Sequence, residues 1–383
     1  MALADDIGLL AADGAAAREP VARARHLPGY AYTSPRILAR EKDVFFMRDW
    51  LCVGRGEELA EPGDYATLRA MGEPLVVARD RGGRLNAFAN VCAHRGVEVA
   101  TGEGNASEFS CPYHGWLYDL TGKLVGAPYM KEAEGFDPGN CRLKPLRLEQ
   151  WAGWIFVSFA PSPRPFVEFI APFERAFAPI RQAELKIAYR FDIELDCNWK
   201  FIYENLLDTY HVGVLHAATI GAFYDTSGNR SDFEPDGAFT AEYRTRTQAP
   251  DGIPLFGAIP WLAERGEDFA MNGYLPPNMS LFVRCDNVNN YTIWPLTPDR
   301  CRVRCYHLIA PSFFDDPEYD AKIRVYRDYQ QAVLEEDRSM LASLQRAMSS
   351  RAYVPGPMSR LESGIHHVIN HHLDRVVGPA PRP

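Results

Sequence analysis

Two short loops, Cys92-Ala-His94-Arg95-Gly96 and Cys111-Pro-Tyr-His114-Gly115-Trp116, decide how the first half of the chain is interpreted. Each loop offers one thiolate and one imidazole beside a glycine, which suits a tight turn. Two Cys and two His also occur in zinc sites, but these more often have C-x2-C or H-x3-H spacing. In one type of 2Fe–2S centre, two Cys hold one iron and two His hold the other. The expected cluster ligands are Cys92, His94, Cys111 and His114, with zinc as the alternative.

The paired loops resemble those of the Rieske family of iron–sulfur proteins. Respiratory members carry an extra Cys in each loop and a Ser after the second His-Gly. Here Val97, Tyr113 and Trp116 stand at these positions. Fewer hydroxyl groups near the sulfurs are expected to lower the reduction potential. The sequence is therefore similar to the oxygenase and ferredoxin branches.

A second polar group lies further along the chain, in the expected helical stretch from Trp199 to His216. On a helix, Asp208 and His211 are i, i+3 neighbours, so a carboxylate meets an imidazole on one face. His211 and His216 are five residues apart, about 140° around an ideal helix. They converge on one ion only if the helix is widened or ends there. The alternative is a pair of core histidines on an amphipathic helix.

This stretch is similar to the iron-binding segment of Rieske non-haem iron ring-hydroxylating oxygenase α subunits. The resemblance implies that His211 and His216 are two ligands of a 2-His-1-carboxylate iron site. It also implies that Asp208 bridges His211 to the cluster of a neighbouring subunit, where it meets His114.

The third iron ligand is expected on a long helix from about Asp320 to Ser349. Asp337 interrupts a mostly apolar stripe on this helix, whereas Glu335 and Glu336 are expected to point elsewhere. A bare carboxylate on a core face needs a cation or donors. An ion pair with Arg is the alternative. The family's Glu-Asp and Gln-Arg pairs match residues 336–337 and 345–346, which again selects Asp337. The other stripe positions are Ile323, Gln330, Leu334, Leu341, Leu344 and Met348.

The expected fold class is α+β, with an all-β Rieske 2Fe–2S domain and a catalytic domain of antiparallel sheet with helices, of the helix-grip type. Residues 1–44 are expected to form an N-terminal arm that packs with the catalytic domain. The Rieske domain is expected over 45–160 and the catalytic mononuclear iron domain over 161–383, with a Pro-rich linker at 161–165.

Composition sets the remaining limits. The chain has 383 residues and a net charge of −9, with no basic run, so nucleic acid is not an expected partner. No apolar segment is long enough for a membrane span, and acidic residues stand where a secretory signal carries positive charge, so a cytoplasmic protein is expected. No nicotinamide or flavin motif is present. Electrons are therefore expected from a separate NAD(P)H-dependent reductase, with or without a ferredoxin.

The resemblance implies the terminal component of an O2-using oxygenase, with one 2Fe–2S cluster and one mononuclear Fe(II) per chain, assembled as a homotrimer. A pure Rieske electron carrier is the alternative from another class, although it has no use for a second iron. Residues 217–310 are rich in aromatic side chains, and seven of these are candidates for the pocket of an apolar or aromatic substrate. The same rings suit an aromatic cage for a quaternary ammonium or methylated amine, and four acids keep that option open. The aromatic residues are Phe223, Tyr224, Phe256, Trp261, Phe269, Tyr274 and Phe282, and the acids are Asp225, Asp251, Glu264 and Asp286.

Overall fold

A computed structural model describes residues 4–379, with the side chains of all but residues 4, 5 and 225–228. The chain forms two compact units. One is Phe46–Glu168, and the other combines the segment before it with the segment from Phe169 onward. The predicted linker at 161–165 therefore lies inside the first unit. The predicted α+β class is confirmed, because the first unit is built from short strands and the second combines a sheet with helices.

The unit Phe46–Glu168 consists of three small antiparallel sheets. The first sheet has the order β1 (Leu51–Arg55), β10 (Trp154–Ser158), β9 (Arg147–Trp151). The second has the order β4 (Leu85–Ala89), β3 (Glu73–Arg79), β2 (Asp64–Ala70), β5 (Glu103–Asn105). The third has the order β6 (Glu108–Ser110), β7 (Leu117–Asp119), β8 (Leu124–Gly126). One Cys–His loop follows β4 and the other joins β6 to β7, so strands hold both loops in place.

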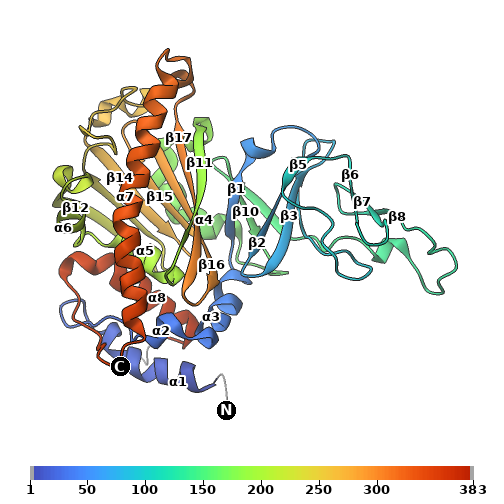
Figure 1. Ribbon diagram of the computed structural model, residues 1–383, viewed down its shortest axis with the longest axis horizontal. Helices are drawn as coiled ribbons and strands as arrows, with labels where there is room; N and C mark the ends of the chain where they lie inside the picture. The colour runs from blue at the N-terminus through green and yellow to red at the C-terminus, as the bar shows by residue number, and fades with distance from the viewer. Residues whose placement is uncertain (1–3, 380–383) are drawn as a thin grey trace. The chain divides into compact units, whose positions relative to one another are not determined.

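The other unit is built on one antiparallel sheet of seven strands (Figure 1). Its order is β11 (Lys186–Leu195), β17 (Arg300–Ile309), β16 (Val288–Thr297), β15 (Met279–Arg284), β14 (Phe269–Leu275), β13 (Phe239–Arg244), β12 (Asp225–Phe233). The chain passes from β14 to β17 by successive hairpins, each strand pairing with the next.

Helices cover both faces of this sheet. Alternate residues of a strand point to opposite faces. Tyr274 packs against Tyr203 of α5 (Trp199–Leu207), with ring centres 5.0 Å apart. On the opposite face, a Cβ at Gly273 would lie 2.8 Å from Phe177 of α4 (Phe166–Phe177), so glycine lets α4 approach closely. The long helix α7 (Tyr319–Met348) lies along the sheet on the side of α5 (Figure 1).

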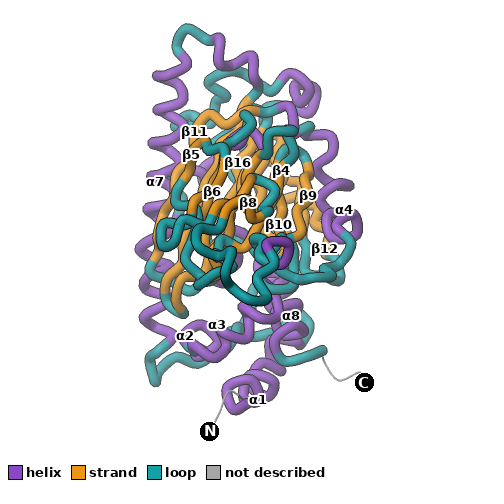
Figure 2. The backbone as a smooth tube through the Cα atoms, turned by 90° about the vertical axis from the view of Figure 1, so that its right-hand side faces the viewer, coloured by secondary structure: helices purple, strands orange, loops and turns teal. Residues whose placement is uncertain are grey.

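The N-terminal helices pack against the end of the chain. Figure 2 shows α1 (Ala4–Asp13), α2 (Tyr30–Thr33) and α3 (Pro35–Glu41) near α8 (Ser363–Val376). Contacts of α3 with α8 connect these distant segments. Among the helices of residues 4–379, none has the length and apolar character needed to cross a bilayer.

Candidate functional site

The two Cys–His loops adopt the same local structure. In each, the Cys N–H donates to a carbonyl five residues later, and the glycine N–H donates back to the Cys carbonyl. Gly96 and Gly115 have φ angles of 83° and 70°, a left-handed conformation that glycine adopts without strain. Cys92 and Cys111 are buried in one hydrophobic cluster, whereas both histidines are exposed. Each loop thus has a shielded sulfur and a solvent-facing imidazole.

The imidazoles of the two loops face each other. Nδ1 of His94 lies 3.1 Å from Nδ1 of His114, and the His94 ring stacks on Trp116. Partial desolvation, followed by the charges of the nearby His94 and Arg95, lowers the pKa of His114, which favours its neutral, metal-binding form. Two buried thiols beside two converging imidazole nitrogens fit the protein ligands of a 2Fe–2S cluster in which two Cys hold one iron and two His hold the other.

Tyr118 contributes to this site, although sequence reasoning missed it. Its hydroxyl oxygen lies 3.2 Å from Sγ of Cys92 and accepts a hydrogen bond from the Ala93 N–H at 3.0 Å. Tyr118 is fully buried and pairs with Phe109 of β6. Its position two residues after Trp116, on a strand leaving the loop, was the available signal.

The predicted helix from Trp199 to His216 is interrupted. Helix α5 ends at Leu207, and a separate turn, α6 (Val212–Leu215), follows. His211 and His216 flank α6 at its two ends, and their ring centres are 5.1 Å apart. Of the two routes to convergence, the structure uses the end of the helix rather than a widened turn.

Asp337 of α7 completes a three-residue group with the two histidines. Its Oδ1 lies 3.1 Å from Nε2 of His216 and 3.7 Å from Nε2 of His211. One ligand atom from each residue lies within 4.8 Å of the others, and no second group of this kind occurs among the described residues. Oδ1 of Asp337 is buried without a hydrogen-bond partner, and among the described side chains the ion pairs of Asp337 are with the two histidines rather than with Arg. An acceptor of this kind, facing two imidazoles, fits a bound divalent cation.

A carboxylate lies behind each histidine. Nδ1 of His211 is 3.1 Å from Oδ2 of Asp208, without hydrogen-bond geometry, and Nδ1 of His216 is 2.6 Å from Oε2 of Glu336. Thr219 also donates to this Glu336 oxygen, at 2.9 Å. Burial lowers the pKa of His216, but the close contact with the Asp337 carboxylate and the hydrogen bond with Glu336 outweigh it, so the pKa lies above its usual value. Such carboxylates orient imidazoles so that Nε2 faces the metal.

Glu336 therefore corrects the sequence interpretation, in which it pointed away from the site. The apolar stripe also differs, because Leu344 is 44% exposed and Gln345 is buried in its place. Gln345 accepts a hydrogen bond from the Asn198 N–H at 2.7 Å, which ties the start of α5 to α7. The two helices that lead to the histidines and to Asp337 are thus joined directly.

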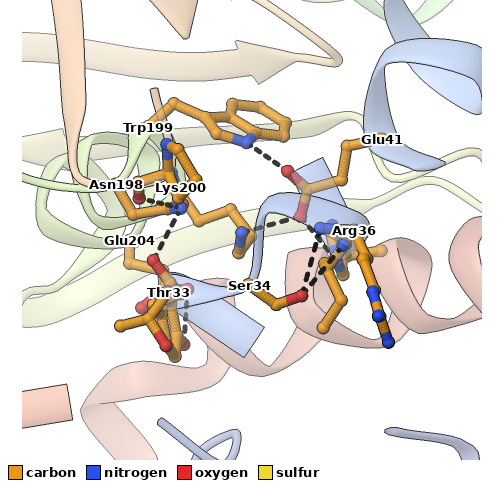
Figure 3. A network of polar contacts seen from close by, with 12 residues as sticks. Thr33, Ser34, Arg36, Glu41, Asn198, Trp199, Lys200 and Glu204 are labelled. Atoms are coloured by element: carbon orange, nitrogen blue, oxygen red, sulfur yellow. Dashed lines mark hydrogen bonds and ion pairs between the residues drawn. The ribbon is translucent and has the colours of Figure 1, made fainter. Parts of the chain in front are cut away.

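A buried ion pair supports the same end of α5 (Figure 3). Lys200 and Glu41 are 1% and 0% exposed, with Nζ and Oε1 2.7 Å apart, and Trp199 donates to the other Glu41 oxygen. Removing one partner of such a pair is costly because the other charge stays buried. The pair therefore fixes how α5 approaches α3.

A pocket opens in front of the two histidines. It extends from α5–α6 and α7 to the sheet, where Tyr243, Asn272, Arg284 and Tyr291 line it. Of the seven aromatic residues proposed for the substrate, Tyr224 and Phe282 line this pocket. The other five, Phe223, Phe256, Trp261, Phe269 and Tyr274, lie outside its lining.

Three of the four acids proposed for a cationic substrate, Asp251, Glu264 and Asp286, do not line the pocket either. Asp251 and Glu264 are exposed, and the side chain of Asp225 lies outside the described residues. Asp286 is buried, accepts hydrogen bonds from Thr247 and Tyr326, and does not reach the pocket lining. The acids of the pocket are Asp208 and Asp337, which belong to the histidine group.

Comparisons with known proteins agree with both halves of the site. The family model for the Rieske [2Fe-2S] domain matches residues 49–146, and that for the ring hydroxylating alpha subunit (catalytic domain) matches residues 182–378. The carnitine monooxygenase oxygenase subunit of Escherichia coli K12 is 30% identical over 335 residues, 85% of each chain. Its counterpart from Acinetobacter pittii is 38% identical over 194 residues, 49% of this chain and 52% of the relative. The match thus spans about half the length of that relative.

Solved structures give the same fold. The quaternary ammonium Rieske monooxygenase CntA with L-carnitine is 25% identical, with a TM-score of 0.78 over 94% of this chain and 97% of the other. A further CntA structure bears on carnitine oxidation and inter-subunit electron transfer. Naphthalene 1,2-dioxygenase from Rhodococcus sp. has a TM-score of 0.80 over 99% of this chain and all of the other, at 20% identity, which is a likeness of fold alone.

The two matched domains bring one 2Fe–2S cluster and one mononuclear iron to the chain. The relatives named for carnitine favour the quaternary ammonium alternative over the aromatic substrate that the sequence had placed first. Both domains are present in order, and the donor sets fit both metal groups. The chain belongs to the family of Rieske non-haem iron oxygenases, which are oxidoreductases.

Proposed function

We propose that this chain is the terminal oxygenase component of a multicomponent system that hydroxylates a quaternary ammonium or methylated amine compound. One oxygen atom of O2 enters a substrate C–H bond, and the other forms water with two electrons and two protons. A separate NAD(P)H-dependent reductase, with or without a ferredoxin, supplies the electrons. The observation that carries the proposal is the His211–His216–Asp337 group at the floor of a pocket whose walls combine tyrosines with polar side chains.

His211, His216 and Asp337 are the proposed iron ligands, and Cys92, His94, Cys111 and His114 are the proposed cluster ligands. Bound iron supplies the centre for O2 activation, and the cluster supplies single electrons. Iron held by these three residues would keep open coordination positions for O2, as in other 2-His-1-carboxylate sites. Glu336 hydrogen-bonds Nδ1 of His216, and the Asp208 carboxylate lies beside Nδ1 of His211, so both favour the orientation that presents Nε2.

The pocket suits a small cationic group. Tyr224 and Tyr243 present adjoining rings, with centres 5.4 Å apart, and both line the pocket. Aromatic faces attract quaternary ammonium groups without a hydrogen bond. The relatives named for carnitine support the same substrate class.

We further propose a homotrimer in which Asp208 connects His211 to His114 of the partner subunit. Asp208 is placed for this role because its carboxylate lies beside Nδ1 of His211 and its side chain is 19% exposed. The exposed position of His114 on its own unit is consistent with such a contact.

Turnover with a surrogate reductase tests the substrate class. The iron-loaded protein is given glycine betaine, γ-butyrobetaine, choline, naphthalene or benzoate, and oxygen uptake is measured together with product. We expect uptake coupled to product with at least one of the methylated amines. Coupled oxidation of naphthalene or benzoate, with none of the amines oxidised, would overturn the proposal.

The bridging role is tested by Asp208→Asn. Asparagine keeps the Oδ1 acceptor for the Tyr210 N–H, which lies 2.6 Å away, but removes the charge beside His211. We expect normal iron content and a cluster that, once reduced, is reoxidised far more slowly in the presence of O2 and substrate. Reoxidation at the wild-type rate, with both metals in place, would show that Asp208 has no part in electron transfer.

A further inference from the structure

A buried arginine faces the proposed substrate pocket. Arg284 is the last residue of β15, and it lines the same pocket as His211, His216 and Asp337. Arg284 is only 4% exposed. A guanidinium stays charged at all ordinary pH values, so this position places a fixed positive charge inside the pocket wall.

The protein supplies hydrogen-bond partners for only part of this guanidinium group. Nη1 donates to the Tyr243 hydroxyl at 3.1 Å and to the Val283 carbonyl at 3.0 Å. The guanidinium carbon lies 5.5 Å from the centre of the Tyr243 ring. Nε is buried without a hydrogen-bond partner. Asp286, two residues further on, interacts with Arg284 electrostatically. A buried charge left in this state is costly unless an anion joins it.

The nearby carboxylates have other partners or roles. Asp286 is two residues further on, but its oxygens accept hydrogen bonds from Thr247, Asn287 and Tyr326. Asp337 is a proposed iron ligand, and one carboxylate with two neutral imidazoles leaves a divalent iron site with a net positive charge. Among the described side chains, no carboxylate therefore hydrogen-bonds the guanidinium of Arg284, and its Nε keeps no partner.

We propose that Arg284 binds a carboxylate of the substrate. The inference rests on the proposed function and narrows its substrate class to zwitterions, with a carboxylate at one end and a quaternary or methylated amine at the other. Arginine suits this role because its planar N–H groups match the two oxygens of a carboxylate. A substrate with a positive charge alone would meet a like charge at this wall.

The pocket also contains a group that attracts the positively charged end of such a zwitterion. Oδ1 of Asn272, on the neighbouring strand β14, is a buried acceptor without a hydrogen-bond partner, and Asn272 lines the pocket. A carbonyl oxygen in this state attracts positive charge and complements the tyrosine rings. The pocket thus holds groups of both kinds, as a zwitterion requires.

Binding measurements separate this role from catalysis. Isothermal titration calorimetry on the anaerobic, iron-loaded protein compares γ-butyrobetaine with choline, which has the same trimethylammonium head but no carboxylate. We expect the wild type to bind γ-butyrobetaine at least about tenfold more tightly than choline. Arg284→Gln is expected to weaken γ-butyrobetaine binding by at least about 30-fold and to leave choline binding unchanged or tighter. Arg284→Lys, which keeps the charge but not the planar fork, is expected to fall between the two.

Arg244→Gln is the matched control, because Arg244 lies on the exposed side of β13, where it pairs with Asp268. It should change neither affinity. Equal weakening of both ligands in Arg284→Gln would show that Arg284 only supports the pocket wall, and an unchanged affinity for γ-butyrobetaine would show that it does not meet a carboxylate. Either result overturns the inference. Should Arg284→Gln fail to fold, a wild type that binds choline as tightly as γ-butyrobetaine overturns it as well.

The outcomes also distinguish this inference from the proposed function. Arg284-dependent binding of γ-butyrobetaine, without oxidation of any methylated amine, would leave the carboxylate site standing and remove the proposed reaction. Oxidation of choline by a protein that does not bind γ-butyrobetaine would support the proposed reaction and overturn the carboxylate site.

Discussion

Replacing Tyr118 by phenylalanine is expected to lower the reduction potential of the 2Fe–2S cluster. The Tyr118 hydroxyl lies 3.2 Å from Sγ of Cys92 and accepts the Ala93 N–H. A cluster-bound Cys sulfur is a thiolate, so the hydroxyl must be the donor in this contact. Its bond strengthens when an added electron makes the sulfur more negative, and the reduced state is the one it stabilises.

The size of the effect follows from the strength of one hydrogen bond. If the bond to the reduced cluster exceeds the bond to the oxidised cluster by about 1 kcal/mol, its loss shifts a one-electron potential by about 40 mV. The ring is fully buried and stays in place in phenylalanine, so the shift comes from the hydroxyl alone. The expected direction is downward.

A redox titration followed by the electron paramagnetic resonance signal of the reduced cluster measures this potential. Tyr65→Phe is the matched control, because it removes a hydroxyl in the same unit that points to the Thr101 carbonyl instead of a sulfur. The control should keep the wild-type potential. An unchanged potential in Tyr118→Phe, or an equal shift in both variants, would refute the reasoning.

Two further predictions concern the catalytic unit. Glu336→Gln removes the charge behind Nδ1 of His216, so iron affinity should fall by about 10- to 100-fold. The iron retained during dialysis against a series of chelators measures this affinity. Retention equal to that of the wild type would contradict the prediction. Burial raises the pKa of Glu204 to about 7. Between about pH 4.5 and 7 the folded chain therefore keeps a proton that the unfolded chain has lost. The free energy of unfolding should fall by up to about 3 kcal/mol as the pH rises through this range. Glu204→Gln keeps the acceptor for the Tyr32 hydroxyl, so it should reduce this fall and be more stable than the wild type at pH 8. Urea unfolding of both proteins at pH 5 and pH 8 measures the difference. Equal pH dependence of the two proteins would contradict the prediction.

The sequence was informative where the chemistry itself restricts residue type and spacing. Both Cys–His loops could be found because few other sites need that arrangement, and Asp337 stood out because a carboxylate on a core stripe requires a partner. The structure brings His211, His216 and Asp337 together as this reasoning expects.

Features that depend on long-range packing were beyond the reach of the sequence. Glu336 was placed away from the site because helical periodicity alone says nothing about a loop that approaches from the side, as the segment after α6 does. The choice of substrate residues failed for a related reason. Aromatic side chains from Phe223 to Phe282 are as useful to a sheet core as to a pocket, so composition could not separate Tyr224 and Phe282 from the five that lie elsewhere.

The iron group depends on one cross-link between helices that are distant in sequence. His211 and His216 follow α5, whereas Asp337 belongs to α7, so their separation is set by how these helices pack. Gln345 lies two turns beyond Asp337 and receives the Asn198 N–H at the start of α5, while the Asn198 side chain donates to carbonyls on two further segments. Because a facial site tolerates displacements of well under 1 Å, this buried network fixes the distance that matters for metal binding. The Gln-Arg pair that follows the Glu-Asp pair in the sequence thus has a physical reason: its glutamine holds α7 in the position from which Asp337 reaches the two histidines.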